Sequence, residues 1–295
     1  MALRPDSLFP LSLPLLLPKE ISETQVHNFL RSIRPANAPV KEMEGYCDQD
    51  WRRFVHTVGL VQGRTGTCLE LGANPYFTTM LLRQFTRFEL VLANYFDATH
   101  GPKGAQDVLY RDFRTGESKR EQLEYFHFSV EAERFPFQDG AFDVVFLCEI
   151  IEHLQNDPVA VLTEIHRVLK PGGVLVLTTP NVNRLENVAR MVAGVNIYDP
   201  YSGYGPYGRH NREYNKHELN LLLNYCGFEA EIMFTADVHE NNAPNYTAID
   251  PLVPLLKFRE SDLGQYIFVR CYANRPPGKK RPSWLYRSYP ADQLE

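Results

Sequence analysis

The chain has 295 residues, of which 44% are hydrophobic and 23% are charged, a composition typical of a globular protein rather than a disordered one. Its formal net charge of −5 provides no overall attraction to a phosphate backbone, which disfavours a polynucleotide partner. The five cysteines are far apart and form no C-x-x-C pair. We therefore expect free thiols in a reducing compartment, and a cytoplasmic protein.

Residues 1–60 are predicted to form a mostly helical N-terminal extension, with the clearest helical pattern at residues 20–33. An apolar run at residues 9–18 is interrupted by three prolines. This run is too short to span a bilayer, and it lacks the charged region and small cleavage residues of a signal peptide. We expect an arm that lies on the domain, rather than a signal or a membrane anchor.

From residue 67 onward, apolar β-type runs alternate with helical patterns, which predicts an α/β fold with a parallel sheet. Asp157 can cap the best-marked helix, and Pro158 suits its first turn. The predicted domain spans residues 61–273, with helices on both faces of the sheet, and residues 274–295 form a tail that is draped on the surface or disordered. Seven strands are expected, at residues 67–71, 89–93, 125–129, 142–148, 174–179, 229–235 and 265–272.

The turn after the first of these strands is a candidate ligand site, because ligands of open parallel sheets bind beyond the carboxyl ends of the strands. Glu70, Gly72, Ala73 and Asn74 stand at this turn, and a helical pattern follows it. Glycine lets the backbone approach a ligand closely, and a helix start supplies free N–H groups. A single turn of this kind is more often a plain connection, so the interpretation depends on other motifs.

Four further segments follow in order. They are EAERFPF from Glu131, FDVV from Phe142, EIIEHL from Glu149 and LKPGG from Leu169. As an ordered set, over about residues 68–272, these segments resemble the class I S-adenosylmethionine (SAM)-dependent methyltransferases of type 11/23. The resemblance implies a Rossmann-like seven-stranded sheet, SAM as the cofactor, and methyltransferase activity.

The same resemblance implies roles at SAM: the glycine turn would hold the methionine end, and Glu131 with the Ala132 backbone would hold the adenine. The residues expected at the cofactor are Glu70, Gly72, Ala73, Asn74, Asn94, Glu131, Ala132 and Glu149. Two departures from the family pattern stand out, because Asn74 and Tyr76 replace the later glycines, and Asn94 replaces the acidic residue that usually binds the ribose. The turn after the first strand lacks the G-x-G-x-x-G pattern, which disfavours a NAD site.

A hydroxyl acceptor must lose its proton during methyl transfer, and His153 and His210 are the candidates for the general base. Glu149, Glu152, His153 and His210 also resemble the two-Glu, two-His metal site of small-RNA 3′-terminal 2′-O-methyltransferases, and the E-x-x-E-H part resembles the ubiquinone-pathway O-methyltransferases. Such a ligand set would suit Mg²⁺ or Mn²⁺. In many class I methyltransferases the histidine shapes the acceptor pocket without a metal, so both interpretations stay open.

Residues 191–215 are predicted to form an insertion on the acceptor side. Tyrosine offers a sugar ring an apolar face with a polar tip, and arginine binds diphosphates and carboxylates. A surface loop with solvated arginines is the alternative. The expected acceptor contacts are Tyr204, Tyr207, Arg209, Arg212 and Tyr214.

The arrangement TTPN, GPYGRHNREY and L-L-x-x-x-G-F resembles bacterial methyltransferases of polysaccharide and glycan biosynthesis. The leading hypothesis is therefore SAM-dependent O-methylation of a hydroxyl on a saccharide or glycan precursor. One alternative is a metal-dependent RNA 3′-terminal 2′-O-methyltransferase. The other is a non-catalytic interaction protein with the SAM fold, which the departures at Asn74 and Asn94 would permit.

Overall fold

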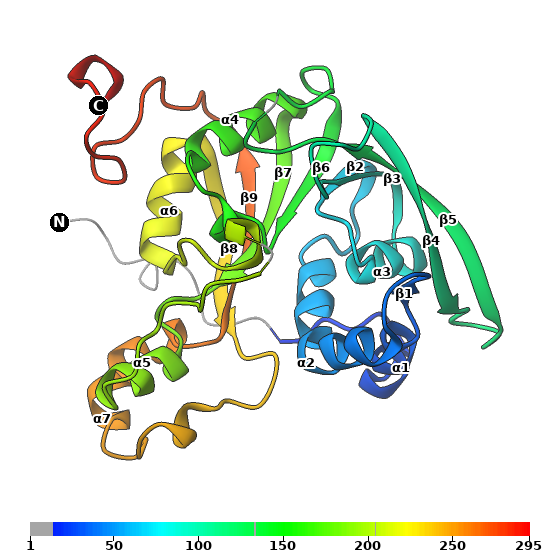
Figure 1. The fold of residues 1–295 in the computed structure, drawn as a ribbon, viewed down its shortest axis with the longest axis horizontal. Coiled ribbons are helices and arrows are strands. Elements are labelled where there is room, and N and C mark those ends of the chain that lie inside the picture. The colour runs from blue at the N-terminus through cyan, green and yellow to red at the C-terminus, as the bar shows by residue number, and fades with distance from the viewer. Residues whose placement is uncertain (1–13, 133, 204) are drawn as a thin grey trace.

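The structure is a computed structural model that describes residues 14–132, 134–203 and 205–295. A nine-stranded sheet crosses the molecule in the order β1-β4-β5-β3-β2-β6-β7-β9-β8 (Figure 1). Its strands are β1 Arg34–Pro35, β2 Thr65–Leu71, β3 Arg87–Asn94, β4 Lys103–Arg111, β5 Ser118–His127, β6 Phe142–Cys148, β7 Leu169–Pro180, β8 Phe228–Ala236 and β9 Tyr266–Ala273. The helices are α1 Glu23–Arg31, α2 Val40–Gly59, α3 Phe77–Phe85, α4 Pro158–Val168, α5 Leu185–Val192, α6 Lys216–Tyr225 and α7 Val253–Leu256, with 3₁₀ turns η2 Ile151–His153, η3 Gly205–Gly208, η4 Ala243–Asn245, η5 Lys257–Asp262 and η6 Ala291–Gln293.

The centre of the sheet is parallel, from β5 through β3, β2 and β6 to β7. The chain builds β3 and β5 on one side of β2 and then crosses to place β6 and β7 on the other side. This reversal of strand order opens a crevice beyond the carboxyl ends of β2 and β6, where open α/β sheets bind their ligands. The predicted α/β class with a Rossmann-like sheet is confirmed.

The expected number of seven strands is wrong, because β1 and β4 add to the sheet beyond β5. β4 and β5 form an antiparallel hairpin that pairs Lys103 with Phe126 and Arg111 with Ser118. An apolar run in the sequence marks only the strands that are covered on both faces. Most residues of β4 and of the first half of β5 are polar and at least partly exposed, so that criterion missed them.

Helices cover both faces of the sheet, as predicted. Leu69 and Leu71 of β2 point to the face covered by α4 and α6, whereas Cys68 between them packs with Leu82 of α3 on the opposite face. Figure 1 shows α4 and α6 on one side of the central strands and α2 and α3 on the other. The alternation follows from the two-residue period of a strand.

The predicted helical extension over residues 1–60 is not confirmed. α2 is part of the domain itself, because Trp51 and Phe54 pack in one buried cluster with Phe77 of α3. Residues 1–13, which hold part of the apolar run expected to form an arm, lie outside the described residues. No helix in residues 14–132, 134–203 and 205–295 combines the length and the apolar character that crossing a membrane requires.

Two segments extend beyond the sheet. α5, η4, α7 and η5 lie together at the end of the molecule that Figure 1 shows at lower left. The C-terminal tail lies against the start of α4, where the Tyr286 hydroxyl donates to Asp157 Oδ1 at 2.7 Å and Arg281 Nη2 donates to Asp157 Oδ2 at 2.5 Å. Asp157 also caps α4 by accepting from the Ala160 N–H at 3.1 Å, as predicted.

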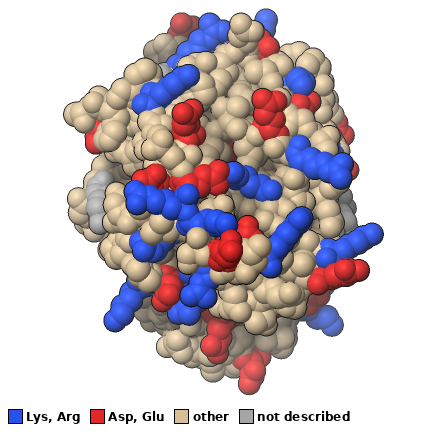
Figure 2. Space-filling model, turned by 90° about the vertical axis from the view of Figure 1, so that its right-hand side faces the viewer, with Lys and Arg blue, Asp and Glu red and all other residues tan. Residues whose placement is uncertain are grey.

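The face at the β4–β5 edge of the sheet carries both signs of charge (Figure 2). Arg83 pairs with Glu121 at 2.5 Å and Lys119 with Glu117 at 2.9 Å. Paired charges of this kind leave little net positive potential for a polynucleotide backbone. This face therefore does not resemble the uniform basic stripe of a nucleic-acid-binding surface.

Candidate active site

A cavity of about 670 Å³ opens at the carboxyl ends of β2, β3, β5 and β6. Gly72, Asn94, Glu131, Glu149 and His153 are among the residues that line it. These residues come from four separate segments of the chain, and they meet at the point where the strand order reverses. The structure thus brings together most of the positions that the sequence assigned to a cofactor, and we call this space the cofactor cavity.

Gly72 makes the first turn of the cofactor cavity possible. Its φ is +67°, and a Cβ at this position would lie 2.9 Å from Ile150 Cδ1. The Gly72 and Ala73 N–H groups both donate to Ala93 O of β3, at 2.9 and 3.1 Å. A residue with a side chain would be strained in this conformation and would collide with Ile150.

The residues that depart from the family pattern stabilise this turn through side-chain hydrogen bonds. Asn94 Oδ1 accepts from the Asn74 N–H at 2.8 Å, and Asn94 Nδ2 donates to the Tyr76 hydroxyl at 3.2 Å. Tyr76 Oη and Asn74 Nδ2 both donate to Gln106 Oε1 at 2.9 Å. The Asn94 side chain is therefore engaged with the protein, and the bracing Gln106 comes from β4, a strand that the sequence did not reveal.

Glu70 does not line the cofactor cavity, which corrects its expected role at the methionine end of SAM. Its buried carboxyl accepts from Thr79 Oγ1 at 2.6 Å and so ties β2 to α3. Burial raises the pKa of Glu70 to about 8, so this carboxyl is largely protonated at neutral pH. Ala73 is buried and Ala132 is exposed, and neither lines the cavity.

Glu131 lines the cofactor cavity and also holds the neighbouring loop in place. Its carboxylate accepts from the backbone N–H groups of Gln155, at 3.0 Å, and Asn156, at 2.8 Å. Four acceptor positions are available on a carboxylate, so these bonds leave Glu131 Oε2 with room for one further donor. The carboxylate of Glu131, which is expected to bind the adenine, is thus held in one orientation by the backbone of residues 155 and 156.

Glu149 stands at the end of β6 with a φ of +54°. Its Oε1 accepts from Thr178 Oγ1 at 2.8 Å and lies 3.7 Å from the guanidinium of Arg53, a buried residue of α2. Burial raises the pKa of the Glu149 carboxyl, and the charge of Arg53 opposes that rise. Sequence reasoning missed Arg53, because no motif includes it and it is far from Glu149 in the sequence.

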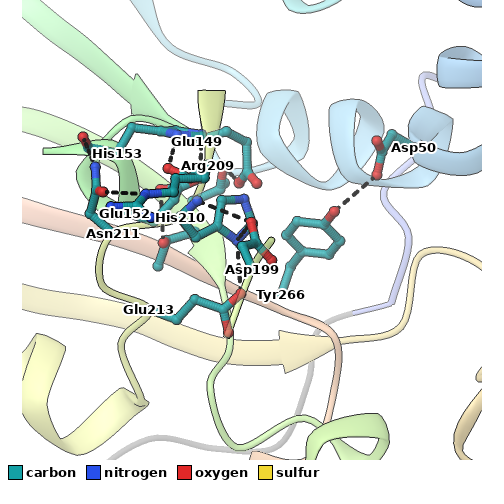
Figure 3. Close-up of polar contacts among 12 residues, drawn as sticks. Asp50, Glu149, Glu152, His153, Asp199, Arg209, His210, Asn211, Glu213 and Tyr266 are labelled. Atoms are coloured by element: carbon teal, nitrogen blue, oxygen red, sulfur yellow. Dashed lines mark hydrogen bonds and ion pairs between the residues drawn. The ribbon is translucent and has the colours of Figure 1, made fainter. Parts of the chain in front are cut away.

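His153 and His210 come together, as the sequence predicted (Figure 3). Their ring centroids are 5.1 Å apart. The segment that carries His210 is attached to the η2 turn by backbone and amide contacts: His153 Nδ1 lies 2.9 Å from Arg209 O, Asn211 Nδ2 donates to His153 O at 2.8 Å, and the Asn211 N–H donates to Glu152 O at 2.8 Å. The fixed backbone explains how two residues so distant in the sequence share one site.

The two histidines differ in their electrostatic surroundings. Burial and the neighbouring His210 lower the pKa of His153. Burial also acts to lower the pKa of His210, but the hydrogen bond with Glu213 at 2.8 Å and the charge of Asp199 outweigh it, and the net pKa is raised. At neutral pH His153 is therefore the neutral imidazole of the pair, and His210 the more readily protonated one.

Glu152 is completely buried beside this pair. Its Oε2 accepts from Thr179 Oγ1 at 3.0 Å, whereas its Oε1 has no hydrogen-bond partner among the described residues and lies 3.8 Å from His153 Nε2. Burial and the charge of Glu149 raise the pKa of Glu152 well above its ordinary value. Ligand atoms of Glu152, His153 and His210 lie within 4.8 Å of one another, whereas Glu149, the fourth expected metal ligand, turns to Thr178 and Arg53.

The insertion at residues 191–215 meets the site only in part. Tyr207 lines the cofactor cavity, and the Arg209 guanidinium lies 4.9 Å from the centre of the Tyr201 ring. Arg212 pairs with Glu218, and Tyr214 is buried in the core with 1% of its surface exposed, so their positions do not support the predicted contact with an acceptor. Tyr204, also predicted to contact the acceptor, lies outside the described residues.

Comparison with known proteins relates this arrangement to methyltransferases. Residues 106–177 match a family described as a methyltransferase domain. A Mycolicibacterium smegmatis protein named "Probable S-adenosylmethionine-dependent methyltransferase" is 36% identical over 96 residues, which cover 32% of this chain and 32% of that protein. Demethylmenaquinone methyltransferase of Beutenbergia cavernae is 39% identical over 74 residues, which cover 24% of this chain and 30% of that protein. Each match spans about a third of the length of the curated relative.

A solved structure extends the likeness to the fold. One chain of the complex between the Haloferax volcanii Trm112 methyltransferase activator and a methyltransferase is superposed with a TM-score of 0.50 at 15% identity, and the match covers 80% of this chain and 94% of that chain. The names of these relatives mention no saccharide, so the glycan acceptor stays a prediction. The family match, the relatives and the shared fold together support a class I SAM-dependent methyltransferase domain in this chain.

Proposed function

We propose that this protein is a SAM-dependent methyltransferase that acts on a hydroxyl group. The observation that carries the proposal is the cofactor cavity at the strand-order reversal, where the Gly72 turn, Glu131 and His153 meet. Its volume of about 670 Å³ lies in the range of ~300–1,000 Å³ that suits ligands of drug-like size. Bound SAM supplies an electrophilic methyl group, and Gly72, Glu131 and Glu149 are the residues that would hold it.

His153 is the proposed general base. Its Nδ1 faces the carbonyl oxygen of Arg209 at 2.9 Å, an arrangement that requires the proton on Nδ1 and leaves the lone pair on Nε2. The lowered pKa of His153 keeps this nitrogen free to take the proton of an acceptor hydroxyl. His210, held by Glu213, lies against the His153 ring and positions it.

We propose a saccharide or glycan precursor as the acceptor and the cytoplasm as the location. Tyr207 at the cavity supports a sugar-like acceptor, because tyrosine combines an apolar face with a polar tip. The five cysteines are free, and four of them are buried, which supports a reducing compartment.

Calorimetry with S-adenosylhomocysteine (SAH) tests the proposal. A well-folded sample should release heat on binding SAH with 1:1 stoichiometry. The absence of heat from such a sample would favour a non-catalytic interaction protein over the enzyme. This measurement requires no knowledge of the acceptor.

Glu131→Ala should weaken SAH binding by roughly 10-fold to 100-fold, because a charged hydrogen-bond acceptor contributes ~1.5–3 kcal/mol. The variant also frees the Gln155 and Asn156 N–H groups, so Glu131→Gln serves as the matched variant that retains an acceptor for them. Calorimetry measures both. Unchanged affinity in both variants would remove Glu131 from the cofactor site.

A second candidate, a metal-dependent methyltransferase such as one acting on an RNA 3′ end, is favoured by one observation. The buried Glu152 Oε1 has no hydrogen-bond partner among the residues that the structure describes, and it lies near His153 Nε2 and His210. Oxygen and imidazole ligands would suit Mg²⁺ or Mn²⁺, which would acidify the acceptor hydroxyl. Titration with Mn²⁺ followed by electron paramagnetic resonance should then show one site that Glu152→Gln abolishes, and a gel shift with RNA would identify the acceptor class.

A further inference from the structure

A second cavity, of about 240 Å³, adjoins the histidine pair. It is formed by α5, by the loop after β8 and by the start of β9, and His210 is part of its lining. His153, whose ring contacts that of His210, lines the cofactor cavity instead. Each cavity therefore has one member of the histidine pair in its lining.

Glu186 of α5 offers an unused hydrogen-bond acceptor in this second cavity. Only 7% of its surface is exposed. Its Oε1 accepts from Gln265 Nε2 at 2.7 Å, but its Oε2 is buried and has no hydrogen-bond partner among the described residues. Buried carboxylate oxygens are rarely left unpaired in proteins, so this atom points to a ligand that donates a hydrogen bond.

Arg190 offers one unused donor one helical turn further along α5. Its Nη2 donates to the Tyr246 hydroxyl at 2.9 Å, whereas its Nε is buried and has no partner among the described residues. Glu186 and Arg190 both line the second cavity, and residues four apart on a helix lie on the same face. The wall of the cavity thus holds two residues that each carry one buried polar atom without a hydrogen-bond partner among the described residues.

The remaining lining indicates a small neutral ligand. The charge of Arg184 is neutralised by Glu213, which lies outside the lining, and Glu186 offsets the charge of Arg190 within the lining. Tyr246 and Tyr266 add aromatic rings to the lining. The volume of about 240 Å³ is below the ~300–1,000 Å³ of sites for larger ligands, which restricts the occupant to about one ring.

We infer that the second cavity binds one pyranose ring of the methyl acceptor, with Glu186 Oε2 accepting from one ring hydroxyl and Arg190 donating to its neighbour. This inference rests on the proposed function and adds the part of the acceptor that is recognised. We call this cavity the acceptor chamber. A ring held there presents its hydroxyls beside His210, and His210 contacts the proposed base His153.

Saturation-transfer NMR on the full chain tests the acceptor chamber. The probes are methyl α-D-glucoside, methyl α-D-galactoside and methyl α-D-mannoside at millimolar concentration, each with and without SAH, and cyclohexanol as a ring that lacks neighbouring hydroxyls. At least one glycoside should bind, and cyclohexanol should not. Glu186→Gln retains the oxygen that accepts from Gln265 but replaces the free acceptor by a donor, and it should weaken glycoside binding by about 10-fold or more.

Arg190→Met should weaken glycoside binding to a similar extent while it retains the apolar stem. Glu124→Gln and Arg114→Met are the matched controls, because both residues are exposed on the β4–β5 hairpin, and they should bind as the wild type does. A thermal melt identifies any variant that fails to fold, and the other chamber variant then decides the test.

Three results would overturn the inference: no glycoside binds the folded protein, Glu186→Gln and Arg190→Met bind glycosides as tightly as the controls do, or uridine binds where the glycosides do not. Failure of the proposed function has a different signature. In that case SAH releases no heat, while glycoside binding and its loss in the chamber variants persist.

Discussion

The cofactor cavity and the acceptor chamber are built in different ways. The cofactor cavity is lined mainly by strand ends, and the polar side chains around its Gly72 turn are hydrogen-bonded within the protein, as Asn94 and Gln106 show. The acceptor chamber is lined by long side chains of α5 and of loops, and one atom each of Glu186 and Arg190 has no hydrogen-bond partner in the part of the chain that the structure describes. The contrast indicates that the cofactor side is preorganised by its backbone, whereas the acceptor side depends on its ligand to satisfy buried polar groups.

The largest effect should come from the residue at the boundary of the two cavities. His153→Ala should lower the rate of methyl transfer by ~10²-fold to 10⁴-fold, because a positioned base contributes that much, while SAH affinity changes little. The rate is measured with labelled SAM and the glycoside that binds the acceptor chamber. His217→Ala on α6 is the control and should retain the wild-type rate; equal rates in the two variants would exclude His153 from the mechanism.

The raised pKa of Glu70 should make the free energy of unfolding depend on pH. Burial raises its pKa from 4.5 to about 8, so the folded state binds this proton more tightly than the unfolded state does. The resulting stabilisation is complete below about pH 4.5 and is lost as the pH rises through about 8.

Glu70→Gln removes this titration. Urea unfolding at about pH 5, 7 and 9 should show the free energy of unfolding falling with pH in the wild type relative to the variant, by about 2–4 kcal/mol at ~1.4 kcal/mol per pKa unit. Parallel curves for the two proteins would mean that Glu70 is ionised in the folded state.

Gly72→Ala should weaken SAH binding in the cofactor cavity and leave glycoside binding in the acceptor chamber unchanged. A side chain at a φ of +67° costs ~1–2 kcal/mol, and the added Cβ also meets Ile150, so SAH affinity should fall by roughly 5-fold to 30-fold. Gly101→Ala is the control, because a Cβ there meets nothing within 4 Å. If Gly72→Ala weakened glycoside binding as much as SAH binding, the two cavities would not bind their ligands independently.

The smallest effect is expected far from both cavities. Tyr286→Phe removes the hydrogen bond to Asp157 at 2.7 Å and should lower the stability by ~1 kcal/mol, seen as a fall of a few degrees in Tm. Tyr289→Phe is the matched control. Neither change should alter the binding of SAH or of a glycoside, and a loss of either would link the tail to the sites.

Local patterns in the sequence were enough to predict the parallel centre of the sheet. The strands around Gly72 and Glu149 are buried, apolar and followed by turn residues, and Asp157 caps α4 as its position before Pro158 indicated. The meeting of His153 with His210 was also predicted, but only through a family resemblance. β4, which carries Gln106, and the first half of β5 were missed, because most of their residues are polar, and only the end of β5 lies in a predicted strand.

Only the tertiary structure decided which polar side chains serve ligands and which serve the protein. Glu70 and Tyr214, both expected at a ligand, are buried among structural contacts, whereas Glu186 and Arg190, which no motif marked, line a cavity. The sequence by itself determined the order of the elements and the position of the turns, because periodicity, caps and glycine requirements depend on neighbouring residues. The use of each polar side chain depends on contacts between residues far apart in the chain, and only packing creates those contacts.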